Sequence, residues 1–145
     1  MSSDIAPFKT EPPRFVILAH SFPAGHERRN HFDLMLEWNG VLLTFAIEDE
    51  IVPGKVVPAT RIPDHRIEYL DIEGPVSGDR GSVKRVLSGS FANPLGTFPD
   101  AIESVELLLD NQRWEIRFCR SEECHDDDHS DSNLNPIGAI EIKGI

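Results

Sequence analysis

Residues 31–47, HFDLMLEWNGVLLTFAI, predict a β-hairpin. Apolar and polar side chains alternate along residues 31–38, which is the period-2 pattern of a half-buried strand. Asn39-Gly40 follows and favours a tight turn, because both turn positions need a positive φ. Residues 41–47 then form the returning strand. The alternation gives the first strand two faces, one with Phe32, Leu34, Leu36 and Trp38, and the other with His31, Asp33, Met35 and Glu37.

Short apolar runs separated by turns continue on both sides of this hairpin. Residues 14–20 have a β-branched centre, and residues 55–62 resemble an edge strand because Pro58 has no backbone donor. Further strands are predicted near residues 66–73, 82–91, 105–109 and 114–118. A spacing of roughly 8–12 residues between short strands is typical of all-β barrels and sandwiches. We therefore expect a mostly β protein, a compact single-domain β-barrel.

The length and the charge pattern set the expected domain boundaries. The chain has 145 residues, a length that suits one domain. Its formal net charge is −11. Residues 121–131 contain six acids and no Lys or Arg, and such a run is typically solvated. We expect a flexible arm at residues 1–13, the folded domain at 14–120 and a flexible acidic tail at 121–145. Residues 134–145 are apolar enough either to add an edge strand or to dock on a partner.

The composition argues against several classes of protein. No apolar run approaches the length of a transmembrane helix, and residues 1–13 lack the apolar core of a secretory signal. Cys119 and Cys124 cannot form a disulfide framework or a four-cysteine zinc site. We therefore expect a cytoplasmic protein with no membrane partner. The acidic balance also argues against a nucleic-acid binder held by charge alone.

His31 and Asp33 are the sharpest local chemical feature. The alternation places them side by side on one strand face, where both can reach one divalent ion of the Mn²⁺, Zn²⁺ or Fe²⁺ kind. Such a site needs a third ligand, and the residues alone leave His20, at the end of the preceding strand, and His26, in the intervening loop. The alternative is a half-exposed polar strand face without a metal.

His65 is the second feature, in the sequence Asp64-His65-Arg66. It follows Pro63 at the start of a predicted strand. Taken singly, a histidine there is typical of a surface or capping residue.

Two motif blocks resemble the 3′-phosphoesterase domain of bacterial DNA ligase D. That family has an apolar strand ending in His, then H-[YF]-D-[FL]-R-L-E, a turn containing Gly, and V-L-x-[ST]-[WF]-A. Here FVILAH at residues 15–20, HFDLMLEWNGVL at 31–42 and TFA at 44–46 fit this order. The family's D-H-P-x-x-Y-x-x-[FI]-E-G fits DHRIEYLDIEG at residues 64–74 except at the proline. The resemblance covers roughly residues 14–120.

The resemblance implies a β-barrel with short flanking helical segments and an activity on DNA ends. The family removes 3′-phosphates and 3′-terminal ribonucleosides, and it prefers Mn²⁺; Zn²⁺ or another transition metal is the alternative. Motif positions imply that His20, His31 and Asp33 are the metal ligands. We favour His20 over His26 because the strand before it aligns without a gap. The implied partners are the 3′ end of a primer–template DNA and separate ligase or polymerase proteins.

The same comparison assigns the phosphate-handling residues. His65 falls on the family's histidine that contacts the reacting phosphate, which makes it the expected catalytic residue, and Tyr69 falls on a tyrosine near the site. Arg61 and Arg66 flank His65 and are the expected phosphate-binding residues together with Tyr69. Their alternative interpretation is as ordinary surface arginines.

Several positions depart from the family pattern. Met35 stands where the family has an arginine, Asp49 falls near a family lysine, and Pro63 replaces an acidic residue. Ten residues, rather than about five, separate His20 from His31. Three functions therefore compete: a 3′-end phosphoesterase, a binding or scaffold module that has lost turnover, and a phosphoesterase acting on a small substrate.

Overall fold

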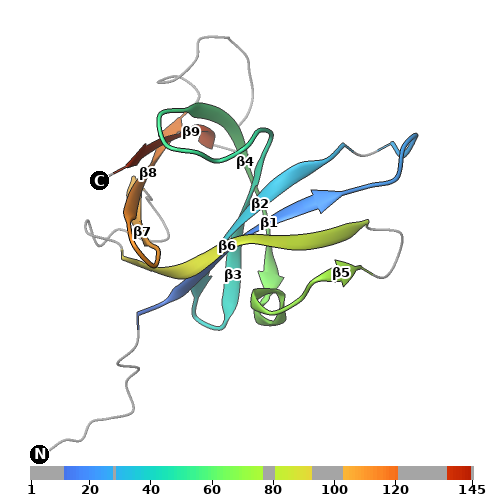
Figure 1. Cartoon of the computed structure of the whole chain (residues 1–145), viewed down its shortest axis with the longest axis horizontal. Coiled ribbons are helices and arrows are strands. Elements are labelled where there is room, and N and C mark those ends of the chain that lie inside the picture. The colour runs from blue at the N-terminus through green and yellow to red at the C-terminus, as the bar shows by residue number, and fades with distance from the viewer. Residues whose placement is uncertain (1–11, 28, 77–80, 93–102, 121–136, 145) are drawn as a thin grey trace, which may run out of the picture.

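The computed structural model describes residues 12–27, 29–76, 81–92, 103–120 and 137–144. These residues form nine strands and one short 3₁₀ helix, labelled in Figure 1. The elements are β1 (Arg14–Ser21), β2 (His31–Trp38), β3 (Val41–Ile47), β4 (Val56–Arg66), η2 (Ile67–Leu70), β5 (Gly74–Pro75), β6 (Ser82–Ala92), β7 (Ser104–Leu108), β8 (Arg113–Arg120) and β9 (Ile137–Gly144).

All nine strands belong to one antiparallel sheet, in the order β1-β2-β3-β4-β9-β8-β7-β6-β5. β1 also pairs with β6, so the pairings of eight of these strands close into a ring. The prediction of a mostly β protein is confirmed. Of the flanking helical segments expected, the described part of the chain contains η2 and no α-helix.

The hairpin predicted at residues 31–47 is present. β2 and β3 pair antiparallel, with Met35 opposite Thr44 and Trp38 opposite Val41. The turn residues both have positive φ, 50° at Asn39 and 83° at Gly40. Asn and Gly tolerate this left-handed region, which explains why this pair joins the strands.

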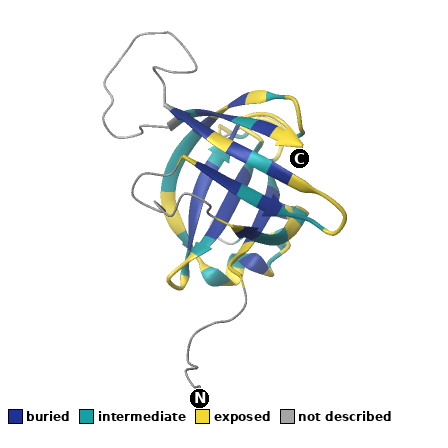
Figure 2. Ribbon diagram, turned by 90° about the vertical axis from the view of Figure 1, so that its left-hand side faces the viewer, coloured by how far each residue is buried: buried dark blue, intermediate teal, exposed yellow. Residues whose placement is uncertain are grey.

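Both faces of β1 and β2 are buried, but against different partners. Leu34 and Leu36 face the main core, which contains residues from seven more strands or loops, whereas Met35 and Leu18 face a second, smaller cluster. Figure 2 shows buried residues along the strands and exposed residues at the turns. The second cluster lies beneath η2 and consists of Val16, Leu18, Met35, Leu42, Leu70 and Val83.

Two strand predictions need correction. β4 is not an edge strand, because it pairs with β3 on one side and with β9 on the other, Pro58 lying opposite Ala139. The strand predicted at residues 66–73 is instead the last residue of β4 followed by η2. An alternating pattern did not reveal that Ile67 and Leu70 pack together on the second cluster.

The domain also extends past the predicted boundary at residue 120. Ile137–Gly144 of the predicted tail form β9, which lies between β4 and β8 inside the sheet. This strand contributes Ile140 and Ile142 to the main core. The predicted arm at residues 1–11 and the acidic run at 121–136 lie outside the described residues. No described helix is long and apolar enough to cross a membrane.

Candidate metal centre

The pairing of β1 with β2 brings His20 and His31 directly opposite one another. Side chains of directly opposed residues lie on the same face of a sheet, and Asp33 follows His31 by two positions on that face. This face is the one opposite the main core, as the alternation in residues 31–38 predicted. The three ligand atoms of His20, His31 and Asp33 all lie within 4.8 Å of one another.

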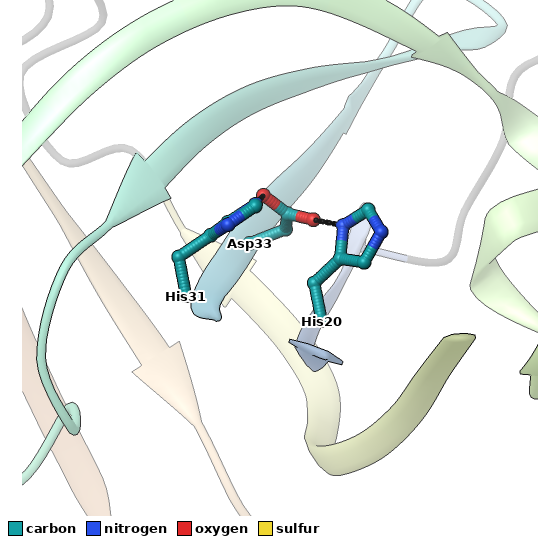
Figure 3. A group of neighbouring side chains, drawn as sticks. All are labelled: His20, His31 and Asp33. Atoms are coloured by element: carbon teal, nitrogen blue, oxygen red, sulfur yellow. Dashed lines mark hydrogen bonds and ion pairs between the residues drawn. The ribbon is translucent and has the colours of Figure 1, made fainter. Parts of the chain in front are cut away.

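Asp33 connects the two imidazoles, as Figure 3 shows. His20 Nδ1 lies 3.1 Å from Asp33 Oδ2, and His31 Nε2 lies 3.2 Å from Asp33 Oδ1. Only 3% of the Asp33 side chain is exposed, against 14% for His20 and 17% for His31. The carboxylate is thus at the bottom of the cluster, and the two rings lie nearer to solvent.

Backbone contacts fix the tautomer of His31. Its Nδ1 lies 3.0 Å from the carbonyl oxygen of Arg29, so Nδ1 carries the proton and donates it. In the neutral ring, Nε2 then has a lone pair directed at Asp33 Oδ1. That oxygen is buried and accepts no hydrogen bond of good geometry from the described residues. Two lone pairs 3.2 Å apart repel each other unless Nε2 is protonated or a cation lies near both atoms.

The pKa of Asp33 is lowered from its ordinary value of 3.8. Burial alone would raise this pKa. The hydrogen bond between His20 and Asp33, and the donor and positive charge that His31 offers when its ring is protonated, outweigh burial and favour the carboxylate. Asp33 is therefore ionised at neutral pH, which is the state needed to bind a cation.

The donor set fits a transition-metal ion on chemical grounds. Two imidazoles and one carboxylate are typical ligands of Mn²⁺, Fe²⁺ and Zn²⁺. The orphaned Oδ1 of Asp33 and the Arg29 carbonyl behind His31 are the kinds of feature found around bound metals. His20, His31 and Asp33 could therefore hold one such ion.

These three side chains line a cavity of about 620 Å³ together with the end of β4. The same cavity is lined by His65, whose Nδ1 lies 3.0 Å from the carbonyl oxygen of Pro63. Nδ1–H donates to that carbonyl, which leaves Nε2 as the nitrogen that can serve a bound molecule. The Tyr69 ring meets the His65 ring edge-on at a centroid distance of 5.2 Å. The cavity is lined by His20, His31, Asp33, Ile62, Pro63, Asp64, His65, Arg66 and Tyr69.

A register shift separates Arg61 from this cavity. In β4, Ile62 lies opposite Thr44 and His65 opposite Leu42, so three steps along β4 match two along β3. In a regular strand, residues four apart face the same side of the sheet. The irregularity reverses the alternation between Arg61 and His65, so these two side chains face opposite sides. The Arg61 guanidinium lies 5.7 Å from the Phe45 ring centroid and 3.4 Å from Asp64. Of the predicted phosphate-binding residues, Arg66 and Tyr69 line the cavity and Arg61 does not.

The two departures at family basic positions also lie away from the cavity. Met35 is 1% exposed and packs in the second cluster with Leu18 and Leu42. Asp49 is exposed and pairs with Lys55 at 3.4 Å. Hydrogen bonding from Glu50 N–H and the charge of Lys55 lower the pKa of Asp49.

His26 is not the third member of the cluster. The ring of His26 instead lies near the ring of Phe22, with a centroid distance of 4.9 Å. The Phe22 ring also stacks on His20 at a centroid distance of 4.6 Å. Pro, Gly and charged residues at 21–30 predict a loop and do not predict the contacts that Phe22 and Asn30 make. The sequence signal that could have pointed to Phe22 is its place two positions after His20, a candidate ligand.

Comparisons with known proteins show which family this chain belongs to. A family model described as the DNA Ligase D 3′-phosphoesterase domain matches residues 24–126. The chain belongs to this family. The match includes His31, Asp33 and His65 but begins after His20, so the place of His20 rests on the pairing of β1 with β2.

Curated relatives carry this family's domain within much longer proteins. The multifunctional non-homologous end joining protein LigD of Mycolicibacterium smegmatis is 33% identical over 96 residues, which is 63% of this chain and 12% of that protein. The multifunctional non-homologous end joining DNA repair protein LigD of Mycobacterium tuberculosis is 32% identical over 98 residues, 66% of this chain and 12% of that protein. The chain thus spans about an eighth of the length of these relatives.

Proposed function

We propose that this chain is a metal-dependent phosphoesterase that processes the 3′ ends of DNA during end repair. The observation that carries this proposal is the shared cavity, which His20, His31 and Asp33 line together with His65. Membership of the 3′-phosphoesterase family and the end-joining function in the relatives' names support it. The closed ring of strand pairings supports the β-barrel expected for the family.

Mn²⁺ is the proposed ion, held by His20, His31 and Asp33. When bound, it would neutralise charge on a phosphate oxygen and lower the pKa of a bound water. His65 is the proposed catalytic residue, because Nδ1 donates to the Pro63 carbonyl and Nε2 is left to accept a proton in the neutral ring, or to donate one to a phosphate oxygen when the ring is protonated. Arg66 would add positive charge at the cavity wall, and Tyr69 would hold the His65 ring.

An assay on duplex DNA with a recessed 3′-phosphate, or a single 3′-terminal ribonucleotide, tests this function. We expect conversion to a 3′-hydroxyl with Mn²⁺ and none with excess chelator. His65→Asn should lower kcat by about 100-fold or more, because general acid–base catalysis typically contributes that much. It should leave Mn²⁺ affinity unchanged. Wild-type protein that binds Mn²⁺ but converts neither end would contradict the enzymatic function.

The second candidate is a binding module that retains the metal and has lost turnover. Met35 and Asp49 favour it, because neither supplies the positive charge that the family has at these positions. This candidate predicts Mn²⁺-dependent retention of 3′-phosphorylated DNA without product. The same assay, read by gel shift and by product analysis, distinguishes the two.

A further inference from the structure

We propose that Phe22 is a positioning residue, whose ring holds the His20 imidazole in the orientation that directs Nδ1 at Asp33. Through His20, Phe22 would set the affinity of the cluster for a divalent metal ion. This inference rests on the proposed metal-dependent function. No motif of the family comparison includes this position.

The ring of Phe22 is packed against the exposed side of the cluster. It stacks on His20 with an interplanar angle of 22° and lies 6.1 Å from the His31 ring, centroid to centroid. Phe22 is 9% exposed although its neighbours Ser21 and Pro23 are exposed. An apolar side chain directed inward from an otherwise exposed loop is held there by its contacts.

The backbone of Phe22 is fixed as firmly as its ring. Its N–H donates to Asn30 Oδ1 at 2.8 Å, so the loop is closed between residue 22 and residue 30. These two residues lie next to the ends of β1 and β2, which carry His20 and His31. The closure explains how ten intervening residues leave His20 opposite His31.

A second segment confines Phe22 from the other side. Gly81 has a φ of +74°, and a Cβ added there would overlap the Ser21 carbonyl oxygen and lie 2.9 Å from Phe22 Cδ2. The Gly81 carbonyl in turn accepts a hydrogen bond from Val76 N–H at 2.8 Å. A glycine is thus needed where this backbone meets the Phe22 ring.

The consequence for metal binding follows from two contacts that orient the His20 ring. Asp33 holds one nitrogen of its ring, and Phe22 supplies the stacked face. Loss of that face lets the ring sample orientations in which its ligand nitrogen points away from the other two ligands. Groups that orient metal ligands typically contribute about 10–100-fold to metal affinity.

The experiment titrates Mn²⁺ into metal-free full-length protein by calorimetry and records the His20 ring resonances of the same samples by NMR. Phe22→Leu should weaken Mn²⁺ binding by about 10-fold. It should also remove the ring-current shift that stacking imposes on His20. Phe22→Tyr keeps the ring and should restore both. Phe91→Leu is the matched control, since Phe91 is a buried phenylalanine of the main core near the far end of β6, and it should change neither.

Equal Mn²⁺ affinity in wild type and folded Phe22→Leu would overturn the positioning role while leaving the proposed function intact. No Mn²⁺ binding by wild type would overturn both. If Phe22→Leu does not fold, Asn30→Ala tests the positioning role instead. This variant removes the hydrogen bond to the Phe22 backbone and leaves the Phe22 ring present. A drop of about 3-fold or more in affinity for Asn30→Ala would support the role, and no drop would overturn it.

Discussion

At the scale of single residues, Asp33 combines two properties that seldom occur together. It is almost fully buried, and its pKa is nevertheless lowered. A buried carboxylate is costly unless neighbouring groups compensate, and among the described residues His20 and His31 do so. The site is therefore arranged around one negative charge that its neighbours keep ionised.

The lowered pKa of Asp33 predicts a specific dependence of stability on pH. Because the folded-state pKa lies below 3.8, Asp33 stabilises the fold above that pH, and this contribution is lost as the pH falls through the folded-state pKa. In metal-free protein, the unfolding free energy of wild type relative to Asp33→Asn should decrease between about pH 5 and about pH 2. Urea denaturation at each pH measures the difference. A difference that stays constant or grows toward acid would contradict the assignment.

Met35 shows why a motif position does not by itself identify a function. The alternation placed Met35 on the face of His31 and Asp33, and it lies there, but η2 and β6 cover that part of the face. Whether a position on this face reaches solvent depends on the elements that pack over it, and the strand pattern does not reveal those elements. That His20, His31 and Asp33 lie together could be predicted because motif order and strand register agree. That Arg61 faces away from His65 could not be predicted, because the register shift in β4 has no local signature.

A buried Met35 predicts the effect of restoring the family's residue. Met35→Arg should lower the free energy of unfolding by about 3 kcal/mol or more, since an unpaired guanidinium would enter the second cluster. Met35→Leu, of similar volume, should cost less than about 1.5 kcal/mol. Urea denaturation of the two variants measures both. An arginine variant as stable as wild type would mean that position 35 can reach solvent or the Asp33 carboxylate.

At the scale of elements, the β2–β3 hairpin is the part of the fold that local sequence determines most fully. Its alternation and its Asn-Gly turn both act over a few residues, so both could be predicted. β4 and η2 could not be predicted in this way. By local sequence Pro58 indicates an edge strand, and it lies in a strand paired on both sides because β9 pairs with β4. Local propensity was overridden there by pairing with a distant segment.

The turn offers a direct test of this local determination. Gly40→Ala should cost about 1–2 kcal/mol, because φ at this position is 83° and an L-residue is strained there. The added methyl group meets nothing within 4 Å, so the cost belongs to the backbone alone. Gly144→Ala is the control, an exposed strand glycine outside that φ region, and should change stability by less than about 0.5 kcal/mol. Similar losses at both positions would contradict the explanation.

At the scale of the whole molecule, β9 completes the ring of strands. It lies between β4 and β8, although residues 67–136 separate it from β4 along the chain. The sequence showed only that residues 134–145 are apolar, since partners far apart in sequence leave no periodic signal. β9 supports β4, which carries His65 and one wall of the cavity.

Removal of one side chain from β9 should therefore destabilise the whole domain. Ile140 is fully buried in the main core, opposite Phe118 and Val57. Ile140→Ala should lower the free energy of unfolding by about 2–5 kcal/mol in a single cooperative transition. Lys143→Ala, an exposed change in the same strand, should cost less than about 1 kcal/mol. Thermal and urea unfolding measure both variants. If Ile140→Ala lost no more free energy of unfolding than Lys143→Ala, the integral role of β9 would be refuted.

The account depends most on whether His20, His31 and Asp33 together hold one divalent ion. Calorimetric titration of Mn²⁺ into metal-free wild type and Asp33→Asn measures this directly, with Asp71→Asn, an exposed acid, as the matched control. We expect one site in wild type and in Asp71→Asn, and a loss of at least about 100-fold in affinity for Asp33→Asn. Equal affinity in all three proteins, or no binding to any of them, would contradict the account.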